Sequence, residues 1–188
     1  MRDIDIRKVL LKSFQNQYKN DSDTLIIPEL GLCQGDARVD LAVVNGLIHG
    51  YEIKSERDTL NRLSGQQYIY NKVLDCVTVV AGSSHLSKIK KTVPKWWGIS
   101  EAKYNNDKLI IVEVRPSKEN STVDPSALVQ LLWRDEALSI LKQRNLHMGV
   151  VSKPRNLMWG RLVECLSLEE LRCEVRQKNK ERQHWRSA

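Results

Sequence analysis

Apolar residues recur along the first half of the chain with two periods, one typical of helices and one typical of strands. Over residues 4–18 they return every three or four positions, which predicts an amphipathic helix. Short apolar runs over 24–30, 38–44 and 47–54 predict three strands. The first of these runs contains Pro28, a residue that sheets tolerate at an edge or a bulge. The pattern therefore predicts a helix followed by three strands.

The same pattern continues with a helix, a strand and a strand pair. Helical spacing over 57–75 predicts a second long helix, with Asp58 as its N-cap. The uninterrupted apolar run 76–82 predicts a buried strand. A short basic helix over 84–93 and a hairpin over 98–115 follow. This alternation of helices and strands predicts an α/β fold with an αβββαβ order at its start.

Past a polar loop, the remaining pattern is helical. We expect three helices, over 126–144, 153–166 and 167–185. Ser152 is the predicted N-cap of the second, and Ser167 with Glu170 forms an S-x-x-E capping box for the third. We therefore divide the chain into a domain over 1–118 and a basic helical extension over 119–188.

Length, composition and charge narrow the class of protein. At 188 residues, with 41% hydrophobic and 28% charged residues, the chain is long enough for one well-cored domain with an appendage. No apolar run reaches the roughly 18 residues of a membrane span, so we expect no membrane partner and a cytoplasmic location. Residues 141–188 carry 11 Lys/Arg against 5 Asp/Glu, which is most of the net charge of +7. This surplus would attract a polyanion such as nucleic acid; a solvated basic helix that binds nothing is the alternative.

Charged residues interrupt the apolar pattern of the first predicted hairpin. Side chains two apart in a strand share a face, so Glu52 and Lys54 lie on one face. A two-residue turn at Asn45 and Gly46 would point Asp40 away from them, whereas a three-residue loop would put Asp40 on their face. The second register also keeps the apolar residues of both strands on a common core side. We therefore predict a loop of odd length, or an equivalent bulge.

Two carboxylates and a lysine on one face have a chemical interpretation. Close carboxylates repel each other unless a cation lies between them, and hard oxygen ligands suit Mg²⁺ or Mn²⁺. Such a cation would polarise a phosphoryl oxygen and lower the pKa of a bound water. Lys54 would orient that water or stabilise developing negative charge. A solvated hairpin face with a Glu–Lys pair and no cation is the alternative.

The order of these elements and charges resembles the PD-(D/E)XK nuclease superfamily. Asp40 lies on one predicted strand, and Glu52, Ile53 and Lys54 form an E-x-K on the next. The resemblance extends from the first helix to the buried strand, but Val39 replaces the proline of the motif. It implies a restriction-endonuclease-like core with a mixed sheet and a Mg²⁺- or Mn²⁺-dependent nuclease, acting on DNA rather than RNA.

The resemblance also implies roles for individual residues. Metal ligands would be Asp40, Glu52, the Ile53 carbonyl and, as an accessory acid, Glu29. Gln66 and Tyr70 stand four apart on the next helix and look like the Q-x-x-x-Y element of RecB-type nucleases. Substrate contacts would be Arg38, Arg62, Gln66 and Tyr70. The wider pattern is similar to a group of small bacterial and phage proteins of this superfamily, which is compatible with repair, defence or mobile-element biology.

A second candidate for nucleic-acid contact is the stretch KIKKTVPKWWG, residues 88–98. Lys90 and Lys91 would contact phosphates, and Trp96 and Trp97 would stack on exposed bases. Tryptophans that pack against the core beside solvated lysines are the alternative.

Two functions from different classes fit the sequence. The first is the metal-dependent nuclease, and the second is a nuclease-like fold that binds nucleic acid or a protein partner with little or no catalysis. A homodimer or a protein partner bound through the C-terminal helices is compatible with either function.

Overall fold

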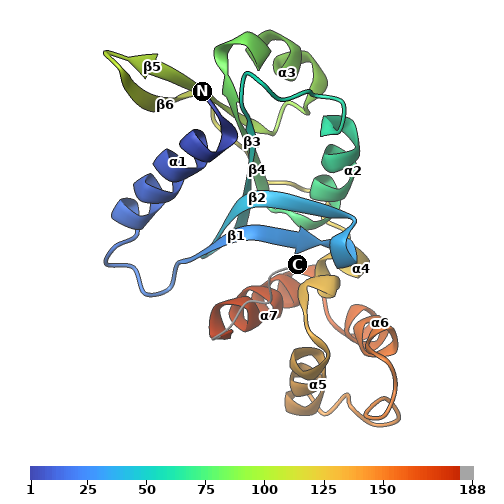
Figure 1. The fold of residues 1–188 in the computed structure, drawn as a ribbon. Coiled ribbons are helices and arrows are strands. Elements are labelled where there is room, and N and C mark those ends of the chain that lie inside the picture. Colours follow the sequence, from blue (N-terminus) through green and yellow to red (C-terminus); the bar gives the residue numbers. More distant parts are fainter. Residues whose placement is uncertain (183–188) are drawn as a thin grey trace.

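The computed structural model describes residues 1–182 and contains one six-stranded sheet with helices on both faces (Figure 1). The strands are β1 (Leu25–Leu32), β2 (Ala37–Val44), β3 (Ile48–Lys54), β4 (Cys76–Gly82), β5 (Gly98–Asn105) and β6 (Lys108–Arg115). The helices are α1 (Asp3–Gln17), α2 (Leu63–Val73), α3 (Leu86–Thr92), α4 (Pro125–Leu128), α5 (Arg134–Gln143), α6 (Arg155–Cys165) and α7 (Leu168–Glu181). Short 3₁₀ turns are η1 (Cys33–Gly35), η2 (Ser83–His85) and η3 (Val129–Leu131).

The strands lie in the sheet in their sequence order, β1 to β6. Strands β3, β4 and β5 are parallel to one another, with α2 and α3 as the crossover connections, whereas the other neighbours are antiparallel. The predicted α/β class with a mixed sheet, a following hairpin and a helical C-terminal part is confirmed. Pro28 lies on β1, an edge strand, as its lack of an N–H donor predicts.

The turn between β2 and β3 has the predicted odd length. Val44 pairs with Ile48, which leaves a three-residue turn over 45–47. Within it the Asn45 N–H donates to the Leu47 carbonyl at 3.1 Å. Glu52 and Lys54 therefore share a face of β3, and the register no longer sends Asp40 away from them.

The expectation of one core side was wrong, because both faces of the sheet are buried. On one face α1 packs through its apolar stripe, and the cluster there is Ile6, Leu10, Phe14, Leu41, Val43, Ile53, Val80 and Ala102. On the other face α2, α4 and the C-terminal helices share a single larger cluster with the sheet. Figure 1 shows α1 and α2 on opposite sides of the strands. The central strands are therefore apolar on both faces, as in sheets with crossover helices.

The helical C-terminal part differs from the prediction in its first element. Instead of one helix over 126–144, α4 and η3 end at Leu131 and α5 starts at Arg134, because Leu132 and Trp133 are extended. The Glu136 carboxylate accepts the Trp133 N–H at 2.7 Å, so it caps a new helix at this point. This cap signal, and not a turn residue, interrupts the predicted helix.

Two of the predicted N-caps are wrong and one is confirmed. Asp58 accepts the N–H and hydroxyl of Ser55, at 2.7 Å each, and so closes a turn before α2 instead of capping it. Ser152 lies outside α6, whose N-cap is Pro154. The Ser167–Glu170 capping box of α7 is present. The end of that predicted helix, beyond 182, lies outside the described residues.

None of the helices in residues 1–182 combines the length and the apolar character that crossing a bilayer requires.

Candidate functional site

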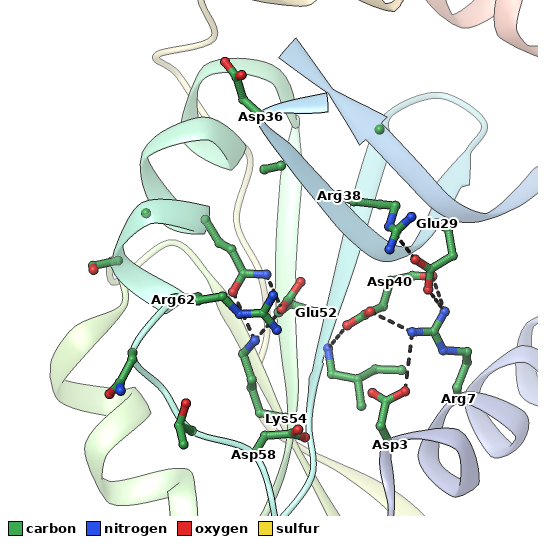
Figure 2. A pocket seen from close by; sticks show the side chains of 18 of the residues that line it. Asp3, Arg7, Glu29, Asp36, Arg38, Asp40, Glu52, Lys54, Asp58 and Arg62 are labelled. Carbon is green, nitrogen blue, oxygen red and sulfur yellow. Dashed lines mark hydrogen bonds and ion pairs between the residues drawn. The ribbon is translucent and has the colours of Figure 1, made fainter. Parts of the chain in front are cut away.

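A polar cavity of about 990 Å³ opens between the start of α1, the start of β2, the end of β3 and the start of α2 (Figure 2). Its acidic lining residues are Asp3, Glu29, Asp36, Asp40, Glu52 and Asp58. Its basic lining residues are Arg7, Arg38, Lys54, Arg57 and Arg62. The three residues with predicted catalytic roles, Asp40, Glu52 and Lys54, all lie on this cavity.

The strands that form the cavity are irregular where Glu29 of β1 lies beside Asp40 of β2. The pairing of β1 with β2 omits Glu29 and Asp40, and Glu29 has a φ of 55°, a left-handed conformation that few non-glycine residues adopt. The pairing of β2 with β3 ends at Leu41, and beyond it the Asp40 carboxylate accepts the Ile53 N–H at 2.7 Å. A side-chain oxygen thus takes the place of a main-chain acceptor, which opens the sheet at the site.

This distortion breaks the alternation of side chains along β2. Val39 belongs to the apolar cluster beside α2, whereas Leu41 belongs to the cluster beneath α1, although the two residues are two apart. In a regular strand both would lie on the same face. Asp40 stands at the change of face, where it reaches both α1 and β3.

Asp40 is held by hydrogen bonds and placed close to a second acid. The Arg7 guanidinium of α1 donates to its Oδ1 at 2.7 Å. Burial, and next the negative charge of Glu52, raise the pKa of Asp40 to about 6, against the lowering effects of the Ile53 N–H and Arg7. Both carboxylates line the same cavity, and the metal-ligand roles predicted for them remain predictions.

Glu52 is enclosed by donors from its own strand and from α2. Its side chain is 2% exposed, and its Oε1 accepts from Lys54 Nζ at 2.6 Å and from Gln66 Nε2 at 2.7 Å. Its Oε2 accepts from the Tyr70 hydroxyl at 2.6 Å. Burial and the Glu52 charge raise the pKa of Tyr70, so this hydroxyl remains a donor. Gln66 and Tyr70 thus position Glu52.

Glu29 lies on the far side of Asp40 from Glu52 and is neutralised by arginines (Figure 2). It forms ion pairs with Arg7 and with Arg38, whose Nε is 2.6 Å from Glu29 Oε2. An accessory metal-ligand role for Glu29 therefore remains a prediction that this pairing does not favour. Arg38 also lines the cavity, where its guanidinium is ion-paired with Glu29. Its predicted contact with substrate remains a prediction.

Arg7 and Asp3 are among the lining residues that sequence reasoning missed, as are Asp36 and Arg57. Arg7 bridges Asp3, Glu29 and Asp40, and so ties α1 to the distorted strands. The available signal was weak: Asp3 and Arg7 are an i,i+4 pair on α1, a spacing common on solvated helix surfaces. Only the docking of α1 on the sheet brings Arg7 to the acids.

The remaining predicted contacts divide between the cavity and the rest of the surface. Arg62 lines the cavity and extends toward Glu52, and it forms no ion pair within the described chain (Figure 2). Lys90 and Lys91 lie on α3 and do not line the cavity, so their substrate role remains a prediction. Trp97 is fully buried, and its Nε1 donates to Asn71 at 2.9 Å. The core alternative therefore holds for Trp97, and base stacking by it was wrong.

The lining residues offer a hard divalent cation few acidic ligands. Among residues 1–182 no three His, Cys, Asp or Glu side chains are grouped to hold a metal, so two carboxylates would be the only acidic ligands. The N–H and carbonyl of one strand residue point to the same side, and the Ile53 N–H points at Asp40. The Ile53 carbonyl therefore faces the same gap and would be the third oxygen donor beside Asp40 and Glu52, whose carboxylates already accept hydrogen bonds from protein groups.

The fold and the cavity define an α/β protein with a mixed sheet, opened at one level to form a polar site rich in paired acids and bases. The family described as Bacteriophage P4 protein cII matches residues 2–188, and the chain belongs to this family.

Two individual proteins are similar to the chain. Protein cII of Enterobacteria phage P4 is 30% identical over 122 residues, which are 65% of this chain and 46% of the relative, so the match spans about half of that protein. A solved protein of unknown function from Silicibacter pomeroyi is 18% identical, with 70% of this chain and 86% of that one covered and a TM-score of 0.41. At this level the structural likeness does not bear on fold or function.

Proposed function

We propose that the chain is a metal-dependent nuclease that hydrolyses phosphodiester bonds, with DNA as the preferred substrate and Mg²⁺ or Mn²⁺ as the cofactor. The observation that carries the proposal is the meeting of Asp40, Glu52 and Lys54 on one cavity, where burial, and next the charge of Glu52, raise the pKa of Asp40. A protein without a cation or substrate to bind there gains nothing from this repulsion. The resemblance to PD-(D/E)XK nucleases supports the same assignment.

Each side chain of the site has a role that follows from its contacts. Asp40, Glu52 and the Ile53 carbonyl would hold the cation, and Tyr70 and Gln66 keep Glu52 in place. The cation would supply positive charge at a phosphoryl oxygen and a water of lowered pKa. Lys54 has three ammonium protons, of which Glu52 and Gln66 accept two, so one remains for a water or a phosphoryl oxygen.

Arg62 offers the site a positive charge for the substrate. It lines the cavity, is exposed, and its guanidinium suits bidentate contact with a phosphate. Its position at the start of α2 adds the positive end of a helix dipole to the same wall.

A second function, binding of nucleic acid without catalysis, is favoured by the charges around the acids. Lys54 already neutralises Glu52, and Arg7 already neutralises Asp40 and Glu29. A site balanced in this way is stable without a cation and would still present Arg38, Arg57 and Arg62 to a polyanion.

Metal binding and cleavage separate the two functions. We expect calorimetry with Mn²⁺ to show binding to the wild type, and cleavage of plasmid and of single-stranded oligonucleotides to require Mn²⁺ or Mg²⁺. Glu52→Gln should lose metal binding, and both Glu52→Gln and Lys54→Met should lose at least about a hundredfold in cleavage rate.

Glu164→Gln is a matched control for loss of a glutamate, since its side chain is 71% exposed on α6 and does not line the cavity. It should cleave and bind Mn²⁺ like the wild type. Equal cleavage by all four proteins would refute the site. Metal-free DNA binding without Mn²⁺ uptake would favour the second function.

A further inference from the structure

A second cavity, of about 580 Å³, adjoins the candidate site across β1. It lies between the outer edge of β1 and the segment that joins η3 to α5, and Arg155 at the start of α6 closes its far end. It shares Glu29, Gly31, Gly35 and Arg38 with the first cavity, so the two cavities adjoin at these residues.

The two cavities adjoin across β1 at a residue that has no side chain. Gly31 lies there, and a Cβ built on it would meet no other atom within 4 Å. Next to it Glu29 is turned out of the regular ladder by its positive φ. The absent side chain leaves space at the crossing, where the Arg38–Glu29 ion pair also lies.

The second cavity carries positive charge that lacks an acidic partner. Arg155 donates to the Gln34 side chain at 2.6 Å, and its guanidinium lies 4.9 Å from the centre of the Trp159 ring. Within the part of the chain that the structure describes, Arg155 forms no ion pair. Glu29 is the acid shared by both cavities, and Arg7 and Arg38 neutralise it. The charge without an acidic partner therefore lies at the Arg155 end, and Arg38 at the other end is shared with Glu29.

We propose that the two cavities form one groove that binds a single strand of nucleic acid, with successive phosphates at Arg38 and Arg155. Pro28 gives the second cavity an apolar wall for bases, beside Trp133, whose ring carries the Arg182 guanidinium 4.4 Å from its centre. A cavity of this volume holds about one or two nucleotides but not a duplex, since pockets of about 300 to 1,000 Å³ enclose single small molecules. The identity of the polymer rests on the proposed function; the continuity and the charge of the groove do not.

The test is binding of labelled oligothymidylates, of about 2 and about 16 nucleotides, measured by fluorescence anisotropy in EDTA; the shorter has one internucleotide phosphate and cannot reach both arginines. Arg155→Gln removes the distal charge, and Gly31→Leu fills the crossing at a position where the fold has room. Arg161→Gln is the matched control, because Arg161 lies on the same helix, is 43% exposed and lines neither cavity.

We expect Arg155→Gln and Gly31→Leu to weaken binding of the long oligonucleotide about tenfold and to leave the short one within twofold. Arg155→Gln should also lower the slope of log affinity against log salt by about 0.7, the value for one phosphate contact on a single strand. Arg161→Gln should match the wild type in both measurements.

The outcomes separate the groove from the proposed function. Unchanged binding of the long oligonucleotide by both variants overturns the groove, even where the wild type cleaves DNA. A duplex that binds as tightly as the single strand, with the same loss in both variants, overturns the single-strand assignment. Absence of cleavage together with the length-dependent loss in both variants overturns the nuclease and supports the groove.

Discussion

The stability of the protein should depend on pH through Asp40, and Asp40→Asn should remove that dependence. In the folded chain the pKa of Asp40 is about 6, raised from 3.8 by burial and by the charge of Glu52. Between these values the folded state keeps a proton that the unfolded state releases. The stabilisation by this proton is complete below pH 4 and is lost as pH rises through 6.

The size of the effect follows from the two pKa values. They differ by roughly 2 units, and each unit corresponds to about 1.4 kcal/mol. The wild type should therefore lose up to about 3 kcal/mol of unfolding free energy between pH 4 and pH 7 because of Asp40. In Asp40→Asn the amide oxygen is still able to accept the Ile53 N–H, but the amide NH2 replaces the oxygen that accepts from Arg7, so the pH dependence and not the absolute stability reports the lost titration.

Urea unfolding of wild type and Asp40→Asn at several pH values between 4 and 7, without divalent ions, measures the effect. The difference in unfolding free energy between the two should shift in favour of the variant as pH rises. Asp135→Asn is the control, because the Asp135 side chain is 95% exposed, and its curve should run parallel to the wild type. Parallel curves for Asp40→Asn as well would refute the raised pKa of Asp40 in the folded chain.

Two further predictions concern the scaffold that holds the site. Gly98→Ala should lower the free energy of unfolding in urea by about 1–3 kcal/mol, because its Cβ would lie 3.0 Å from the Ser117 nitrogen. Gly65→Ala, in open space on α2, should be neutral or stabilise by up to about 1 kcal/mol. Equal effects of the two substitutions would contradict the packing around Gly98. Arg172→Met should cost about 3 kcal/mol, because Asp75 is fully buried and its Oδ1 lies 3.1 Å from Arg172 Nε, and a loss below about 1 kcal/mol would show that Asp75 finds other compensation.

Most of the element order was predictable because its signals are local. The apolar stripe of α1, the buried run of β4 and the capping box at Ser167 and Glu170 each lie within a few residues of the structure that they specify. The prediction of one helix over 126–144 was wrong because two local signals in that segment conflict. The amide of Trp133 has a capping acid three residues later, and helical spacing alone does not show which of the two signals wins.

The sequence by itself determined the face shared by Glu52 and Lys54, because strand parity depends only on spacing. The odd length of the turn before them was predicted correctly, but from a single core side that the sheet does not have. Only the tertiary structure decided how Asp40 reaches the site. Its strand changes face at that residue, and Arg7, distant along the chain, comes from α1 to bind it. Such contacts depend on how a helix docks on a sheet, which is set by the summed burial of its apolar stripe and by no local motif.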